Sequence, residues 1–380
     1  MKIDVKQGFI NLSRYLALLV TTYIVFCFIF VVYDICNNLY ISPQLKKLSK
    51  LEDKKYVIAI VSPSTRPGER QQAEMIKDTA QKMGHLVYYY SFNDSDMAMF
   101  LPARYMNEFL LYILSKIFKP DVHLAISFHI DIDLPDPKIM YISVPPEYYV
   151  KRVQETYTDI KNYNNFLDIN MVNSDDDWLS PLLHKKVNRY YGIVGVPANA
   201  YKASEHNKLL LFGSLWGRKT DNLYGAIKKL AKEDYMFFIK HNYLILEDEK
   251  TQKFADPADS LIDLQKRLNQ YGMGLCAHSR YHIKAGVPSS RIFEIISSSA
   301  LAISDLNPFI IKFFGDNVLY YDQNASAEEV YKQINSHVLW ARKNPLEASK
   351  KARNAHEILQ DKFTTETFIE GIIKVFPKSN

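Results

Sequence analysis

The residues best suited to chemistry lie together in one stretch of the second half of the chain, His278 to Glu294. This stretch joins a predicted strand to a predicted helix, and the first turn of that helix contains Ser289, Ser290 and Arg291. Unpaired backbone N–H groups and the positive end of the helix dipole suit a phosphate at such a position. Glu294, one turn further on, could accept hydrogen bonds from a ribose diol. The alternative is that Ser289 is only an N-cap and Glu294 only a surface residue.

A longer block that includes these residues resembles a known family. GVPSSRIFEIISSSALAISDLNPFIIKFFGDNVLYYD, residues 286–322, is similar to the nucleotide-sugar-binding half of group 1 glycosyltransferases of the GT-B architecture. The similarity is greatest to a bacterial subgroup with a G-[IV]-P-S-x-R-I-F-E motif, and it covers about residues 208–363. The resemblance implies two Rossmann-like, doubly wound α/β domains that face a cleft. It also implies a nucleotide-sugar donor as substrate, with no cofactor and no bound metal.

The resemblance assigns roles around the donor sugar. The family pairs two glutamates eight positions apart, and Glu294 matches the second, which holds the donor ribose. The first glutamate would fall at Gly286, so the sugar contact is either missing or supplied by another group such as Lys284. Gly213 and His278 are expected to line the donor sugar or its loops.

The donor diphosphate requires cations, and the family supplies them from the loop after the first strand of this domain. In this chain that loop contains Arg218 and Lys219, with Ser214 where an arginine is common. A guanidinium can bind two phosphate oxygens at once. Lys240, after the next predicted strand, is a further candidate beside Ser289, Ser290 and Arg291. Each loop cation could equally be a solvated surface charge.

The first half offers residues for the acceptor side. His129 follows the predicted strand 121–128 and should project from the carboxyl edge of a sheet. A histidine there could position the acceptor or the donor sugar, or act as an acid or base near neutral pH. A structural histidine is the alternative. Ser64, Thr65 and Arg66 follow the first predicted strand and could contact the acceptor.

The elements that must position these residues alternate between strand and helix, which predicts parallel sheets covered by helices on both faces. The predicted strands of the first half are 55–62, 86–90, 121–128, 139–144 and 166–173, with helices at 69–83 and 104–118. The pattern restarts after Asn199. We therefore expect an anchor and basic stalk at 1–54, an acceptor domain at 55–200, a nucleotide-sugar domain at 207–363, and a C-terminal helix at 364–380 that is a candidate to cross back to the first domain.

An uncharged apolar run at residues 15–33 predicts a membrane anchor before the first domain. Its 19 residues would span about 28 Å as a helix, close to the ~30 Å hydrocarbon core. A cleaved signal peptide is the alternative, but no small residues follow the run. The lysines at 46, 47, 50, 54 and 55 favour a single-pass protein with its body on the cytoplasmic side of a bacterial inner membrane, in contact with membrane lipid.

Composition excludes several function classes. Glycine is scarce, at 13 of 380 residues, and no P-loop or G-x-G-x-x-G motif occurs. The net charge of +5 is spread along the chain, so we expect no nucleic-acid partner. The D-x-D sequence at 131–133 resembles a metal site, but the same pattern recurs at 94–96 and 175–177. Cys276, His278 and His282 do not fit a zinc spacing.

The sequence therefore predicts a membrane-anchored glycosyltransferase that moves a sugar to a glycan or a lipid-linked acceptor, as in the biosynthesis of surface polysaccharide or lipopolysaccharide. Retention of anomeric configuration and independence from metal are further expectations from the resemblance. The alternative is a non-catalytic GT-B protein that binds a glycan or a partner at the membrane. The missing glutamate at Gly286 motivates this alternative.

Overall fold

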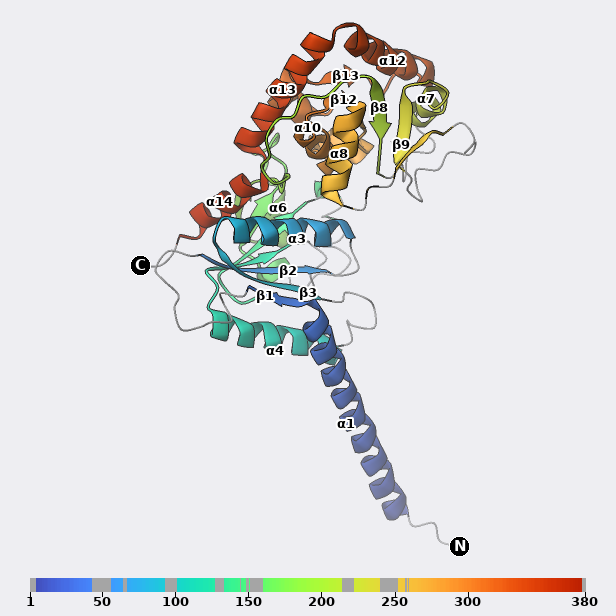
Figure 1. The fold of residues 1–380 in the computed structure, drawn as a ribbon. Helices are drawn as coiled ribbons and strands as arrows, with labels where there is room; N and C mark the ends of the chain where they lie inside the picture. Colours follow the sequence, from blue (N-terminus) through green and yellow to red (C-terminus); the bar gives the residue numbers. More distant parts are fainter. Residues whose placement is uncertain are drawn as a thin grey trace.

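The structure, a computed structural model, contains two α/β domains and a long helix that projects from the first of them (Figure 1). It describes residues 5–42, 56–63, 67–92, 101–126, 133–143, 145–147, 150, 160–213, 222–239, 252–256, 258 and 260–377. Each domain is built on a sheet whose neighbouring strands run parallel, apart from one edge strand. The predicted fold class of two doubly wound α/β domains is confirmed.

The N-terminal domain has a seven-stranded sheet of order β1-β3-β2-β4-β5-β6-β7. The inner strand β2 is buried along its whole length, as expected for a parallel strand with helices on both faces. The strands are β1 (Leu39–Ile41), β2 (Val57–Pro63), β3 (Leu86–Phe92), β4 (Val122–Ala125), β5 (Lys138–Ile142), β6 (Asn165–Asp168) and β7 (Asn188–Tyr191). The helices are α3 (Pro67–Lys82), α4 (Leu101–Phe118) and α6 (Leu179–Leu183).

The C-terminal domain has a six-stranded parallel sheet of order β10-β9-β8-β11-β12-β13. Its strands are β8 (Lys208–Leu211), β9 (Met236–Ile239), β10 (Phe254–Ala255), β11 (Gly272–Cys276), β12 (Leu301–Asp305) and β13 (Leu319–Tyr321). Its helices are α7 (Asn222–Leu230), α8 (Leu261–Tyr271), α9 (Arg280–Ala285), α10 (Ser290–Ser297), α11 (Pro308–Phe314), α12 (Ala327–Lys343) and α13 (Pro345–Lys362). A last helix, α14 (Thr365–Val375), follows this domain in the chain.

Several short strands differ from the sequence prediction, β1 and β6 among them. Residues 39–41, which we predicted to belong to a stalk, form the edge strand β1 and pair antiparallel with β3. The strand predicted at 166–173 ends at Asp168, because the Asp168 carboxylate accepts a hydrogen bond of 2.9 Å from the backbone N–H of Asn170 and turns the chain. Both strands are short, and local patterning identifies short strands poorly.

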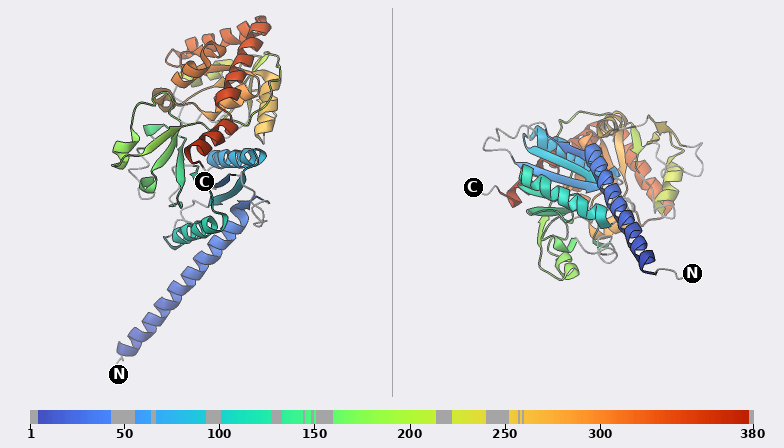
Figure 2. Two further views of the ribbon diagram at one scale, coloured as in Figure 1. Left: turned by 90° about the vertical axis from the view of Figure 1, so that its left-hand side faces the viewer. Right: turned by 90° about the horizontal axis from the view of Figure 1, so that it is seen from below.

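Helix α1 (Val5–Asn38) contains the predicted membrane span and extends away from the N-terminal domain (Figures 1 and 2). Large apolar side chains along it, such as Leu19 and Phe26, are exposed. The prediction of a transmembrane span is nevertheless not supported. Within the described part of the chain, no helix combines the length and the apolar character that crossing a membrane requires.

The chain crosses between the domains twice, and the two crossings lie side by side. Val196 pairs with Thr364 in an isolated parallel bridge, and the backbone N–H of Thr365 donates to the Val196 carbonyl at 3.0 Å. Gly195 lies so close to the second crossing that an added Cβ would overlap the Phe363 carbonyl oxygen. After this crossing, α14 packs against α3 of the N-terminal domain. The connection between the domains is therefore a pair of close-packed backbones, not a single linker.

We predict that Gly195→Ala lowers the free energy of unfolding by about 1–3 kcal/mol, because the methyl group displaces the crossing backbone. Gly371→Ala is the matched control. Nothing lies within 4 Å of an added Cβ at this position in α14, so alanine should raise stability by about 0.5–1 kcal/mol. Urea unfolding of both variants measures the two effects, and equal stability of the variants would contradict the close packing.

Candidate functional site

Two adjacent cavities lie between the domains, at the carboxyl ends of the strands of the C-terminal sheet. The larger, of about 840 Å³, is bounded by Gly213 after β8, by Ile239 at the end of β9, and by the start of α10. The smaller, of about 290 Å³, is bounded by α9 and α10 on one side and by Tyr141 and Ser143 of the N-terminal domain on the other. Ligands of doubly wound sheets bind at this edge.

The start of α10 faces both cavities. Ser290 and Glu294 line each of them, Ser289 lines the smaller, and Arg291 lines the larger. Ser289 occupies the N-cap position with extended backbone, but its side chain makes no capping hydrogen bond. The end of the helix therefore presents backbone N–H groups toward the cavities without a side-chain cap, which is the arrangement that suits an anion.

Arg291 is held in place by the carboxyl ends of two neighbouring strands. Its Nη1 donates to the Ala277 carbonyl, which follows β11, at 2.9 Å. Its Nε would be 2.5 Å from a Cβ at Gly213, which follows β8 and has a φ of +81°. Only glycine leaves room for the guanidinium here and adopts this backbone conformation without strain. The structure thus brings Gly213 and Arg291 together, while their predicted roles, at the donor sugar or its loop and at the diphosphate, stay predictions.

Glu294 lies where the two cavities meet. Burial raises the pKa of the Glu294 carboxyl to about 7, although the Arg291 guanidinium and a hydrogen bond from Ser290 act in the opposite direction. A carboxyl group with this pKa gains or loses its charge near neutral pH, and such groups are concentrated at functional sites. The interpretation of Glu294 as only a surface residue therefore does not fit its position.

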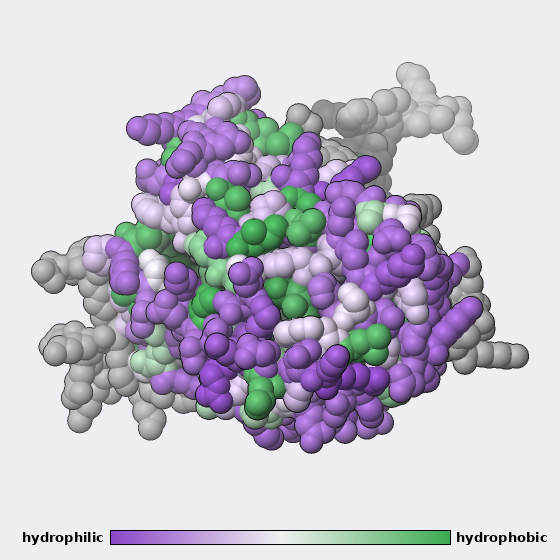
Figure 3. All heavy atoms as spheres, turned by 90° about the horizontal axis from the view of Figure 1, so that it is seen from above, coloured by the Kyte–Doolittle hydropathy of each residue, from purple (hydrophilic) through white to green (hydrophobic). Residues whose placement is uncertain are grey.

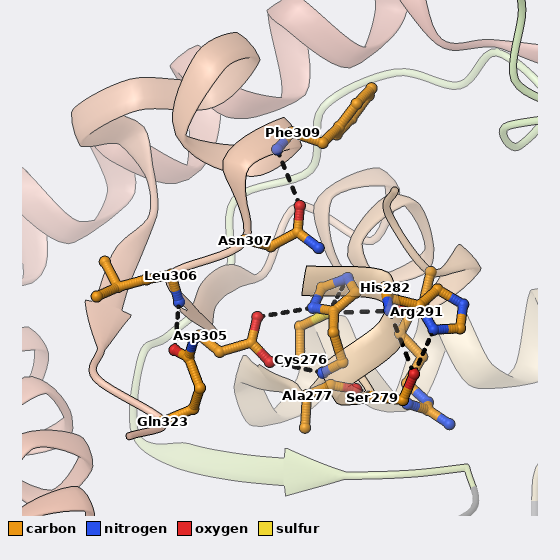
Figure 4. A network of polar contacts seen from close by, with 12 residues as sticks. Cys276, Ala277, Ser279, His282, Arg291, Asp305, Leu306, Asn307, Phe309 and Gln323 are labelled. Atoms are coloured by element: carbon orange, nitrogen blue, oxygen red, sulfur yellow. Dashed lines mark hydrogen bonds and ion pairs between the residues drawn. The ribbon is translucent and has the colours of Figure 1, made fainter. Parts of the chain in front are cut away.

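A buried network of polar contacts supports the loop between β11 and α10 (Figure 4). The Asp305 carboxylate accepts from the backbone N–H of His278 at 2.6 Å and contacts His278 Nδ1 at 2.8 Å. Asn307 donates to the Val287 carbonyl at 2.9 Å. Burial alone would lower the pKa of the His278 imidazole, but the Asp305 carboxylate and Cys276 raise it to about 10. His278 therefore supports the loop, and its buried side chain cannot reach a donor sugar.

Two other residues predicted around the donor sugar lie elsewhere. The Lys284 side chain is 75% exposed and pairs with Glu147 at 3.4 Å, and Lys284 does not line either cavity. Gly286 ends α9 with a φ of +67°, and an added Cβ would lie 3.1 Å from Val172 Cβ of the N-terminal domain. A side chain at position 286 would therefore meet the other domain.

The remaining predicted residues lie outside the part of the chain that the structure describes. They are Ser64, Thr65 and Arg66 for the acceptor, His129, and the diphosphate candidates Arg218, Lys219 and Lys240. Most residues that line the smaller cavity were not predicted from the sequence, among them Gln71, Tyr141 and His282. They lie on separate elements, so only the folded chain brings them together. Over the described ranges, no group of acidic, histidine or cysteine side chains could hold a metal ion.

Comparison with known proteins identifies the fold. No family model matches the sequence, and no curated protein matches it. Among solved structures, a glycosyltransferase from Rickettsia africae is similar at a TM-score of 0.53 and 13% identity, over 85% of this chain and 98% of that one. WaaG, described as a glycosyltransferase of lipopolysaccharide biosynthesis, is similar at 0.54 and 13%, over 85% and 100%. HepE of Anabaena with UDP-glucose is similar at 0.51 and 12%, over 84% and 98%.

At these identities the likeness is one of fold: the chain has the two-domain α/β fold seen in glycosyltransferases, with parallel sheets. The comparisons do not confirm the specific motif at 286–294 that the sequence suggested.

We predict that Asp305→Asn lowers the free energy of unfolding at pH 6 by about 3 kcal/mol, because it leaves a buried imidazolium without its partner. The folded pKa of His278, about 10, lies above the ordinary value of 6.5. Its contribution to stability is therefore complete below pH 6.5 and is lost as the pH rises toward 10. Urea unfolding at pH 6 and pH 9 measures this, and a difference that does not shrink at pH 9 would contradict the ion pair.

Proposed function

We propose that the protein is a glycosyltransferase that transfers a sugar from a nucleotide-sugar donor. The observation that carries the proposal is the convergence of Glu294, Arg291 and the uncapped start of α10 on two cavities between the domains. A helix N-terminus and a guanidinium suit a diphosphate, and a carboxylate suits a ribose diol. Similarity of fold to glycosyltransferases, one of them in a complex with UDP-glucose, supports the same conclusion.

In this proposal the departing nucleoside diphosphate is stabilised electrostatically. Negative charge develops on the diphosphate as the bond to the sugar breaks, and the α10 dipole and the Arg291 guanidinium lie where that charge appears. Arg291 is already fixed by Ala277 and Gly213, so it loses little side-chain freedom when it binds. Walls from both domains enclose the smaller cavity, which helps to exclude water that would otherwise hydrolyse the donor.

The proposal extends to the acceptor substrate and to the stereochemistry of the transfer. We propose a glycan or lipid-linked acceptor of the surface-polysaccharide or lipopolysaccharide type, with retention of anomeric configuration and no metal requirement. These features follow from the resemblance of residues 208–363 to group 1 enzymes. The alternative is a non-catalytic protein of this fold that binds a glycan or a partner at the membrane, and turnover of a bound nucleotide sugar distinguishes the two.

We further propose that the N-terminal end of the molecule associates with a lipid bilayer. Exposed apolar residues run along α1, and α4, which contacts α1, exposes Phe109, Tyr112 and Ile117 beside Lys116. Apolar side chains flanked by cations suit the interface of an anionic membrane. The opposite end of the molecule, formed by the C-terminal domain, has a mostly hydrophilic surface (Figure 3). A lipid surface at the α1 end would leave the cavities accessible to a donor from solution.

We predict that the full chain binds at least one of UDP, GDP, ADP and dTDP in isothermal titration, and that Glu294→Gln weakens this binding about tenfold or more at pH 8. The amide keeps the size of the side chain but removes the charge that strengthens hydrogen bonds to a diol. Failure of the wild-type chain to bind any of these nucleotides would refute the proposed function.

The pH dependence separates this role from a structural one. With a pKa of about 7, Glu294 should bind the donor more tightly as the pH rises from 6 to 8. The folded pKa of Glu294 lies above its ordinary value of 4.5, so ionisation of the buried carboxyl lowers the free energy of unfolding. This loss of stability grows as the pH rises from 4.5 through 7. Glu294→Gln should therefore be at least as stable as the wild type at pH 8 while it binds less nucleotide. Loss of both properties would point to a structural role instead.

For lipid association we predict that the full chain floats with vesicles of phosphatidylethanolamine and phosphatidylglycerol. The double substitution Leu19→Asp and Phe26→Asp should reduce the floated fraction severalfold, because each carboxylate is costly to bury in lipid. The exposed pair Leu339→Asp on α12 and Leu346→Asp on α13, in the C-terminal domain, is a matched control that should leave flotation unchanged. Equal flotation of the α1 variant and the wild type would contradict the proposal.

A further inference from the structure

Position 286, where the family resemblance would place a glutamate for the donor sugar, is a glycine that does not line the smaller cavity. Gly286 carries no side chain, and its missing Cβ points at Val172 of the N-terminal domain, 3.1 Å away. The loop around Val172 is tied to the same turn by Asn173, whose side-chain amide donates to the Ala285 carbonyl at 3.2 Å. The turn at 285–286 therefore serves as a contact between the domains. A group that recognises the sugar must come from another residue.

His282 is placed to supply such a group. It lies in α9, four residues before Gly286, and lines the smaller cavity together with Ser289 and Glu294. The Ser279 hydroxyl contacts His282 Nδ1 at 2.6 Å and also caps α9 by accepting from the His282 backbone N–H (Figure 4). The orientation of the ring is thus set by the residue that starts its own helix.

The His282 ring also lies beside the buried pair of His278 and Asp305. The centroid of the His282 ring lies 6.3 Å from that of His278, which is buried and bound to Asp305 at the end of β12. A side chain supported in this way binds a ligand with little loss of rotamer freedom.

The arrangement of the two cavities indicates which part of a nucleotide sugar would lie beside His282. The larger cavity contains Gly213, Arg291 and Ile239, and it joins the smaller at Ser290 and Glu294. A base in the larger cavity, with its ribose at Glu294 and its diphosphate at Ser290 where the cavities join, would direct the attached sugar into the smaller one. Its volume of about 290 Å³ is near the lower end of ligand pockets, which is ~300–1,000 Å³. An imidazole can donate to or accept from a sugar hydroxyl.

We propose that His282 binds a hydroxyl of the transferred sugar and that Ser279 positions its ring. This assignment rests on the proposed function. His282 in α9 would make the polar contact to the sugar that Gly286, without a side chain, cannot make. It restricts the donor to sugars that present a hydroxyl toward α9.

The test compares two ligands that differ only in the sugar. Isothermal titration of the full chain with UDP and UDP-glucose, GDP and GDP-mannose, ADP and ADP-glucose, and dTDP and dTDP-glucose gives the affinity that the sugar adds. His282→Ala should reduce the added affinity about 3- to 10-fold, the effect of one hydrogen bond, and leave the affinity for the parent diphosphate unchanged. His282→Gln, which keeps a donor and an acceptor, should restore part of it, and Ser279→Ala should produce a smaller reduction.

His184→Ala is the matched control, because this exposed histidine lies outside both cavities. Thermal melting of each variant establishes that it is folded. An unchanged sugar contribution in His282→Ala would overturn the inference while leaving the proposed function intact. Equal losses for diphosphate and nucleotide sugar would also overturn it, as would a wild-type chain that binds both ligands equally. If no diphosphate binds the wild-type chain, the proposed function fails, and the inference fails with it.

Discussion

The buried pair of Asp305 and His278 is the interaction on which the candidate site depends. Asp305 ends β12 and binds both the backbone and the ring of His278, which follows β11, so one carboxylate joins the ends of two strands. A buried charge of this kind is costly unless its partner and its hydrogen bonds are in place. The pair therefore specifies one arrangement of the loop above it. The start of α10, Arg291 and the helix α9 all take their positions from that loop.

The second constraint is the contact between the domains. The adjacent crossings at Val196 and Thr364 limit how the domains can move, because two backbones must bend together. On the other side of the cavities, Asn173 and Lys312 each bridge the domains through a hydrogen bond to a backbone carbonyl. A backbone pair on one side and side-chain hydrogen bonds on the other suit a hinge movement. The side-chain hydrogen bonds would break when the domains open and form again when they close, and the crossings would act as the pivot. Such a movement would admit a nucleotide sugar and then exclude water from it.

Much of the fold could be predicted from the sequence, because its strands and helices have strong patterns. The fully buried β2 has the continuous apolar run of a parallel strand, and α10 follows a loop with the composition of a helix start. The short strands β1 and β7 were missed, since three or four residues carry little periodicity. The residues from Ser289 to Glu294, which are adjacent in sequence, were predicted together, and Ser289, Ser290, Arg291 and Glu294 line the two cavities; their roles toward a donor stay predictions. His278 was placed beside the sugar because sequence alone does not show that Asp305, 27 residues later, buries it.

The scarcity of glycine has a structural consequence at the site. A phosphate can be held by a glycine-rich loop whose backbone N–H groups surround it, and this chain has no such loop. Two glycines near the cavities have other tasks: Gly213, which lines the larger cavity, makes room for the Arg291 guanidinium, and Gly286, at the end of α9, allows Val172 of the other domain to approach. The glycines thus remove side chains so that a cation and a neighbouring domain can come close. The groups that we propose for anion binding are then a helix end and a guanidinium, and the guanidinium is held by its hydrogen bond to the Ala277 carbonyl. A site of this kind gains affinity from charge and preorganisation, and it therefore requires the rigid support that Asp305 provides.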